Sequence, residues 1–167
     1  MDLTAQLSDE LKQLVGFSSS VPKNVQISGG SGLVLNIAFV AVDRLSSAFE
    51  SLSLHVPQLV GHEVKILNEW AEALSKRVTY LLEHIGPIEI DPAGSQVLIR
   101  STPPDQSQGT RQFYEVLLSA KTNGTFLLKR YRSETGQPGR TSVDILLTNE
   151  TLRKLVNDLV ETIPQVS

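Results

Sequence analysis

A run of cations interleaved with a tyrosine is the clearest candidate for binding chemistry in this sequence. It reads KRYRSETGQPGRT over residues 129–141, and its candidate interaction residues are Lys129, Arg130, Tyr131, Arg132 and Arg140. Cationic groups contact phosphates and an aromatic ring stacks on a base, so the combination is typical of single-stranded nucleic-acid binding. It is also typical of the solvated end of a β-hairpin, or of a surface for an acidic protein partner.

The charges of the chain are distributed unevenly. Residues 100–140 contain seven Lys or Arg and three Asp or Glu, a balance of +4, whereas residues 1–86 contain six cations and nine anions, a balance of -3. The whole chain has a net charge of -3, 5% aromatic residues and a pI near 5.6, unlike the basic domains that bind nucleic acid. Nucleic-acid binding is therefore the alternative hypothesis, and its candidate residues are Arg100, Lys129, Arg130, Arg132 and Arg140.

Known catalytic and metal-binding patterns are missing. The chain has no cysteine, which excludes disulfides, thiolate nucleophiles and cysteine-ligated metals. The stretch SGGSGL (residues 28–33) lacks the second glycine of a nucleophile elbow and the lysine of a phosphate-binding loop. His55, His62 and His84 do not have metal-ligand spacing, and their role stays open. We therefore predict no catalytic residue, no metal and no cofactor, and a small enzyme with an unrecognised site is the second alternative.

The first half of the chain has apolar residues at helical spacing. Leu3, Leu7, Leu11 and Leu14 predict an N-terminal helix that stops at Gly16. Two longer stripes with steps of three and four residues follow, over residues 34–52 and 64–85. A short Pro- and Gly-bearing link separates them, so they predict an antiparallel helical hairpin.

The single tryptophan lies on the second of these stripes. Trp70 comes one position before Ala71, at the edge of the predicted apolar face. Packing beneath a sheet is the simpler interpretation. The alternative is a partly exposed interface anchor, because tryptophan is enriched in binding hot spots.

The second half alternates as strands do. Asp-Pro-Ala-Gly (residues 91–94) predicts a turn, and Asn123-Gly124 predicts a hairpin with a two-residue loop. That loop would place Glu115 opposite Arg132, a cross-strand ion pair. The end of the chain predicts a helix with Asn149 as its cap and the apolar face Leu152, Leu155, Val156, Leu159 and Ile163.

These elements predict an α+β fold in one domain, residues 1–167. We expect a loosely attached N-terminal helix and loop (1–30), a helical hairpin (31–85), and then a 4-5-stranded antiparallel meander with a C-terminal helix packed on the sheet (86–167). The element order is shared by many unrelated modules and names no family.

For function, the leading hypothesis is a non-enzymatic protein-protein interaction or assembly module. We expect it to self-associate through its helical part as a homodimer, because closed symmetric dimers are the commonest oligomers. The longest apolar stretch, GLVLNIAFVAV, has 11 residues, and the N-terminus lacks the features of a signal peptide. The expectation is a soluble cytoplasmic protein with no membrane partner.

Overall fold

The computed structural model describes residues 2–83, 85–86, 88–101, 109–121 and 124–165. In this part of the chain there are three α-helices, α1 (Leu3–Leu14), α2 (Val64–Arg77) and α3 (Asn149–Thr162). The strands are β1 (Ser18–Ser28), β2 (Val34–Val42), β3 (Ser46–His55), β4 (Glu89–Asp91), β5 (Gln96–Ser101), β6 (Thr110–Ser119), β7 (Thr125–Glu134), β8 (Thr141–Val143) and β9 (Ile145–Thr148).

All nine strands belong to one antiparallel sheet, in the order β1-β2-β3-β7-β6-β5-β4. The two central strands, β3 and β7, pair only over residues 52–55 and 125–128 and then separate. We call the opening between the separated strands the fork. Residues 141–148 occupy it, because β8 pairs with β7 and β9 pairs with β3. The predicted class, α+β with an antiparallel sheet, is confirmed, but the predicted 4-5-stranded meander is wrong.

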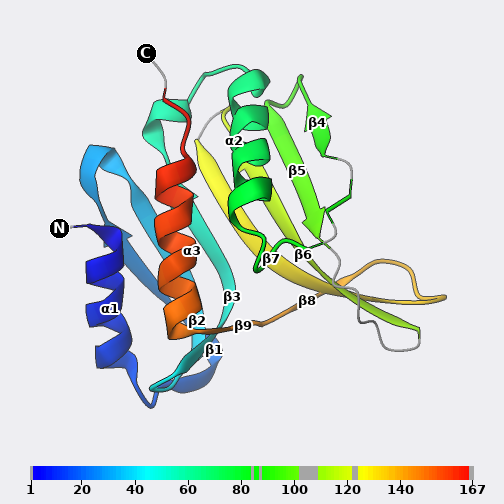
Figure 1. Ribbon diagram of the computed structural model, residues 1–167. Coiled ribbons are helices and arrows are strands. Elements are labelled where there is room, and N and C mark those ends of the chain that lie inside the picture. The colour runs from blue at the N-terminus through cyan, green and yellow to red at the C-terminus, as the bar shows by residue number, and fades with distance from the viewer. Residues whose placement is uncertain (1, 84, 87, 102–108, 122–123, 166–167) are drawn as a thin grey trace.

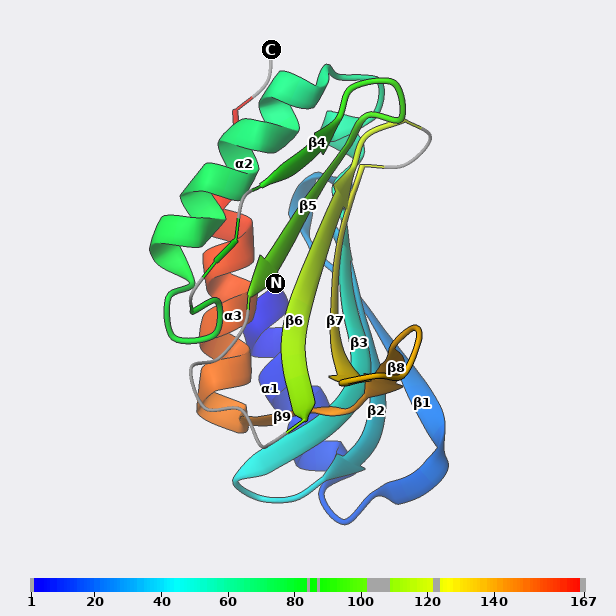
Figure 2. The ribbon, with the colours of Figure 1, turned by 90° about the vertical axis from the view of Figure 1, so that its right-hand side faces the viewer.

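The helices form one layer on one face of the sheet, with α3 between α1 and α2 (Figure 1). We call the face beneath the helices the inner face and the opposite one the outer face. In the view from the side, the turn after β7 bends away from the helices (Figure 2). The core lies between the helices and the inner face, and its largest fully buried side chains include Trp70, Phe39, Phe49 and Phe126.

The prediction of a helix over residues 34–52 is wrong, because these residues form most of the hairpin β2–β3. Leu35, Ile37 and Phe39 alternate along β2 and are at most 1% exposed, whereas Leu45, a member of the predicted helical stripe, is 79% exposed. The segment is rich in β-branched and aromatic residues, which favour strands. The turn is fixed by Asp43, whose Oδ1 accepts hydrogen bonds from the backbone N–H groups of Leu45 and Ser46, each at 2.8 Å.

The second predicted helix exists but is shorter than expected. It ends at Arg77 rather than continuing to residue 85, and Val78 and Leu81 remain buried beyond its end. Without a helix over 34–52 there is no helical hairpin at 31–85. The apolar stripe of α2 packs instead against the sheet and α3.

The helices at the two ends of the chain follow their predicted patterns. The four leucines of α1 are all buried, and Gly16 has a φ of 94° just after the helix. The cap of α3 is Thr148, whose Oγ1 accepts a hydrogen bond from Thr151 N at 3.1 Å, and not Asn149. Asn149 is buried and is hydrogen-bonded to Ser47 Oγ and to the Asp43 carbonyl, so it fixes α3 to the β2–β3 turn.

The β6–β7 hairpin has a longer loop than predicted. Pairing begins at Ser119 and Thr125, so residues 120–124 form the connection, of which Thr122 and Asn123 lie outside the described residues. Ala120 and Gly124 do not pair with each other. Instead Ala120 N–H donates to Ser95 O, at 3.0 Å, and Gly124 O accepts from Val56 N–H, at 2.6 Å. These bonds to neighbouring segments shift the register, and Glu115 lies opposite Lys129 rather than Arg132.

We predict that Gly124→Ala destabilises the protein, because an added methyl group would overlap the carbonyl oxygen of Val56. Overpacking of this kind costs about 1–3 kcal/mol. Gly30→Ala is the matched control, since a methyl group there meets no atom within 4 Å. Urea denaturation of both variants checks this prediction, and equal midpoints would contradict it.

Candidate anion-binding site

The basic run of residues 129–140 does not form one surface. Successive side chains of β7 point to opposite faces, so Lys129 and Tyr131 lie on the outer face while Arg130 and Arg132 lie on the inner one. Arg130 lies 5.5 Å from the Tyr114 ring, and its Nε is buried without a hydrogen-bond partner in the described part of the chain. Arg132 is exposed and pairs with Glu134 at 2.9 Å. Only part of the predicted cluster is therefore brought together.

Glu115 organises the cations of the outer face. It lies on β6 opposite Arg100 of β5, and its carboxylate contacts Arg100 Nε at 3.3 Å. Arg140, which comes just before β8, binds the same carboxylate with two nitrogens, one of them at 3.1 Å. The Glu115 side chain is 11% exposed, whereas those of Arg100 and Arg140 are 46% and 37% exposed. A shielded carboxylate thus holds two more accessible guanidinium groups.

These arginines border a hollow of about 450 Å³ on the outer face. We call it the arginine hollow, and its lining residues are Arg100, Arg111, Phe113, Ser133, Gly139 and Arg140. Arg111, Phe113 and Glu115 are spaced two apart on β6, so their side chains share one face. Three arginines therefore line one hollow together with Phe113 and Ser133, and guanidinium groups bind anionic groups through their N–H donors.

The position of Arg140 is fixed from two sides. Its guanidinium carbon lies 3.8 Å from the centroid of the Tyr131 ring, a cation–π contact. Its hydrogen bonds to Glu115 raise the pKa of Arg140 above its usual value, so it stays charged. Gly139, just before it, has a φ of 80°, a conformation that glycine adopts without strain. The loop before β8 therefore presents Arg140 in a defined orientation.

Three of the lining residues, Phe113, Ser133 and Gly139, were not predicted as site residues from the sequence. Arg111 entered only through the charge balance. The alternation of Arg111, Phe113 and Glu115 along one strand was the signal that could have grouped them with Arg100. The grouping of these residues also requires the order of the strands in the sheet, which the sequence pattern does not contain.

The other sequence-predicted candidates lie elsewhere. Trp70 is fully buried, its Nε1–H donates to Thr162 Oγ1 at 3.0 Å, and its ring packs 6.0 Å from that of Phe126. It therefore packs beneath the sheet and is not an exposed anchor. His55 and His62 are half-buried, and His84 lies outside the described residues.

The described residues contain no group of three or more histidine and acidic side chains arranged to hold a metal ion. None of the helices found among them is long and apolar enough to span a bilayer.

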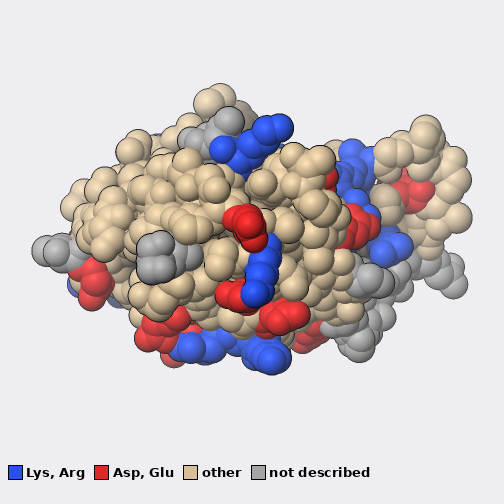
Figure 3. All heavy atoms as spheres, turned by 90° about the horizontal axis from the view of Figure 1, so that it is seen from above, with Lys and Arg blue, Asp and Glu red and all other residues tan. Residues whose placement is uncertain are grey.

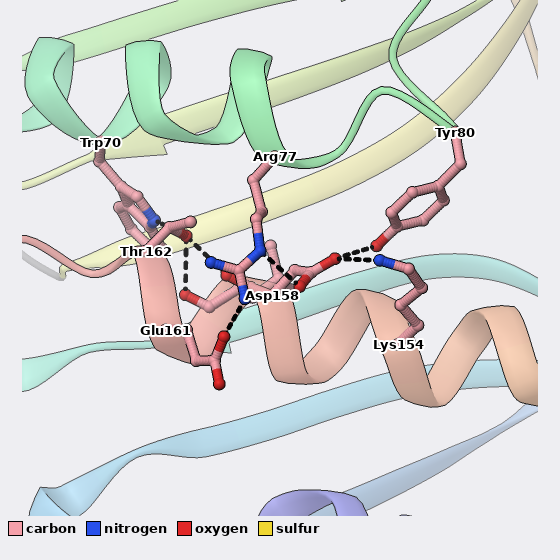
Figure 4. Close-up of polar contacts among 8 residues, drawn as sticks. Trp70, Arg77, Tyr80, Lys154, Asp158, Glu161 and Thr162 are labelled. Carbon is pink, nitrogen blue, oxygen red and sulfur yellow. Dashed lines mark hydrogen bonds and ion pairs between the residues drawn. The ribbon is translucent and has the colours of Figure 1, made fainter.

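A second polar cluster joins α2 to α3 and centres on Asp158, which is 2% exposed (Figure 4). Its Oδ1 accepts a hydrogen bond from Arg77 Nε at 3.0 Å. Its Oδ2 accepts from Tyr80 Oη at 2.7 Å and from Lys154 Nζ at 3.3 Å. Arg77 also pairs with Glu161.

This cluster is best explained as a structural clasp. Both oxygens of the buried carboxylate are occupied by donors, which is the arrangement that burial of a charge requires. Burial, and then the hydrogen bond to Asp158, raise the pKa of Tyr80, so Tyr80 remains the proton donor. The clasp begins at the C-terminal end of α2 and holds that end against the C-terminal half of α3 (Figure 4).

We predict that Asp158→Ala lowers the free energy of unfolding by about 2–3 kcal/mol, since it removes three hydrogen bonds to a buried charged group. The half-exposed side chains of Arg77 and Lys154 remain hydrated, which limits the loss. Glu161→Ala is the matched control. Its side chain is 48% exposed, and an exposed ion pair contributes at most about 1 kcal/mol. Denaturation curves that show equal losses would contradict the clasp.

Comparison with known proteins does not identify this chain. No protein family model matches it, and neither does any curated protein or any solved structure.

Proposed function

We propose that the protein is a non-enzymatic protein-protein interaction module that binds an acidic segment of a partner protein on its outer sheet face. The observation that carries this proposal is the arginine hollow, a space of about 450 Å³ that three arginines line. Clusters of arginine are a recurring means of recognising acidic or phosphorylated peptide segments. The cytoplasmic location expected from the sequence remains part of the proposal.

The surface beside the hollow also favours a protein partner. Leu98, Leu117 and Leu127 lie next to one another across β5, β6 and β7 on the outer face, and each is half-buried. The three helices lie on the opposite face (Figure 2). An apolar stripe beside a charged hollow resembles the apolar centre and polar rim of protein interfaces.

Nucleic-acid binding has less support than a protein partner. Arg132 and Arg130 point to the other face, Arg140 covers the Tyr131 ring, and Phe113 is 8% exposed, so the aromatic rings are poorly available for base stacking. Acidic side chains lie beside basic ones on the face seen from above (Figure 3). An enzyme site between helices and sheet also has less support, because Trp70 and Phe126 fill that interface.

We predict that a hexaglutamate peptide at about 50 mM salt, where weak electrostatic binding is least screened, shifts backbone NMR signals of β5, β6 and β7. The double variant Arg100→Gln/Arg140→Gln should weaken this binding about tenfold or more, the effect of losing one charge-assisted hydrogen bond or more.

Arg44→Gln is the matched control, because Arg44 is an exposed cation on the β2–β3 turn, outside the hollow. Equal loss in the control would contradict the proposal, as would the absence of any shift. Tighter binding of a single-stranded oligonucleotide that also depends on Arg132 would favour the nucleic-acid alternative.

Self-association is a second candidate function, but not for the reason taken from the sequence. Residues 34–52 are strands, and the apolar stripe of α2 is buried within the chain. A different observation supports it, a hollow of about 290 Å³. Its lining combines the apolar residues Phe17, Ala41, Val42, Ala48 and Leu146 with Gly16, Ser18, Asp43 and Ser46. Leu146 is 64% exposed, and exposed apolar surface of this kind often marks an interface.

If a second copy covers this hollow, light scattering should show a mass that rises with concentration, and Leu146→Glu should abolish the rise. Ile90→Glu is the control, since Ile90 is also exposed, at 47%, but lies on β4. A constant monomer mass at every concentration would remove self-association from the proposal.

A further inference from the structure

We infer that Leu45, on the β2–β3 turn, is an anchor that enters a hollow on a second copy of this chain. The hollow is the space of about 290 Å³ that has Ala41 and Ala48 in its lining, and we call it the alanine hollow. This inference rests on self-association, the second candidate function, and names the group that each copy inserts into the other. It does not depend on the arginine hollow.

Exposed apolar side chains surround the alanine hollow. Leu146 is one of its lining residues and is 64% exposed, and Leu45, on the turn that borders it, is 79% exposed. Val15, which directly precedes the lining residue Gly16, is 47% exposed. Single exposed apolar residues are ordinary on a protein surface, but several around one hollow mark an interaction site.

The turn holds Leu45 in a fixed position. Its backbone N–H donates to Asp43 Oδ1 at 2.8 Å, and its carbonyl oxygen accepts from Asn149 N–H at 2.7 Å. Asn149 is buried at the start of α3, and its Nδ2 also donates to the Asp43 carbonyl, at 3.1 Å. A group that is already ordered loses little conformational entropy when it binds. Leu45 is therefore preorganised as an anchor.

The chain carries both the anchor and a hollow that can receive it. The alanine hollow lies beside the turn, because Asp43 and Ser46 of the turn belong to its lining. Its volume is several times the roughly 30 Å³ that one water molecule occupies, so a leucine side chain can enter it. In a symmetric dimer the same surface patch faces itself. Pairing of two copies therefore fills both hollows and covers both leucines without any other component.

The charges beside the anchor and in the hollow are complementary. Arg44 is exposed next to Leu45 and has no ion pair within the described part of the chain. Asp43 lines the hollow, and backbone hydrogen bonds from Ser46 and Leu45 keep its pKa below the ordinary value, so it is charged at neutral pH. Entry of Leu45 into the hollow of a second copy brings the neighbouring Arg44 toward the Asp43 of that copy. This complementarity favours a second copy as the occupant.

The test measures the dissociation constant of the dimer by light scattering over a range of concentrations. Leu45→Ser should raise this constant about a hundredfold or more, because two leucine side chains leave the interface. The exposure of Leu45 predicts that this variant stays folded. Ile90→Ser is the matched control, since Ile90 is exposed on β4, at the other edge of the sheet from β1, and it should not change the constant.

A mixing experiment separates the anchor from the hollow. Ala48→Leu fills the hollow and keeps the anchor, so this variant alone should dissociate as readily as Leu45→Ser. An equimolar mixture of the two variants should associate about tenfold more tightly than either alone, because one of the two contacts, and half of the lost free energy, is restored. Ala41→Leu is a second variant that fills the hollow, and urea denaturation shows which variants are folded.

Normal association of Leu45→Ser, or no gain on mixing folded variants, would overturn this inference. If Leu146→Glu abolished association and Leu45→Ser did not, self-association would stand and the role of Leu45 would be wrong. A constant monomer mass of the unmodified protein would overturn both, and would leave the binding of an acidic segment untouched. Masses larger than a dimer would show a head-to-tail contact and would overturn the symmetric pairing.

Discussion

The structure depends on the packing of one helical layer against one face of a broad sheet. All three described helices contribute to the same core, which they share with the inner-face residues of β2, β3, β5, β6 and β7. Because side chains alternate along a strand, every residue buried under the helices leaves a neighbour that points to the other face. The outer face therefore follows from how the core is built, and the residues on it are not needed for the packing under the helices.

The fork between β3 and β7 connects this packing to the arginine hollow. Where the two strands separate, residues 141–148 enter the sheet and cross from one strand to the other. The loop that leads into this segment places Arg140 over Tyr131 and beside Glu115. Glu115 then joins Arg140 to Arg100 on β5. The hollow thus combines three parts of the sequence that only the sheet topology brings together.

The sequence predicted those elements in which one periodic pattern dominated. The leucines of α1, the apolar face of α3 and the alternation of β6 and β7 each indicate a single structure. The segment 34–52 carries two patterns at once, since Val34, Ala38 and Ala41 fit a helix while Leu35, Ile37 and Phe39 fit a strand. The β-branched and aromatic residues of the segment favour the strand, and its pairing with β1 and β7 stabilises it. The local pattern does not contain the identity of these partner strands.

The candidate site was predictable only in part, because its assembly also depends on long-range strand pairing. The basic residues were visible in the sequence, but the face to which each one points depends on register. In the observed β6–β7 register, Ala120 N–H donates to Ser95 O and Gly124 O accepts from Val56 N–H, so the ends of the hairpin are bonded to segments outside it. A shift in register changes the partner of Glu115 from Arg132 to Lys129, and the real ion pairs with Arg100 and Arg140 follow from strand order and loop position.

One face of the sheet is covered by helices while the other is open. The chain has no cysteine, so single cysteines at neighbouring positions of β3 test this claim by their rate of reaction with a thiol reagent. Ser53 lies on the outer face opposite Leu127 and is half-buried, whereas Leu52 is fully buried beneath the helices. We expect Ser53→Cys to react under native conditions and Leu52→Cys to react only when the protein unfolds. Protection of both positions, or reaction of both at equal rates, would contradict this account of the fold.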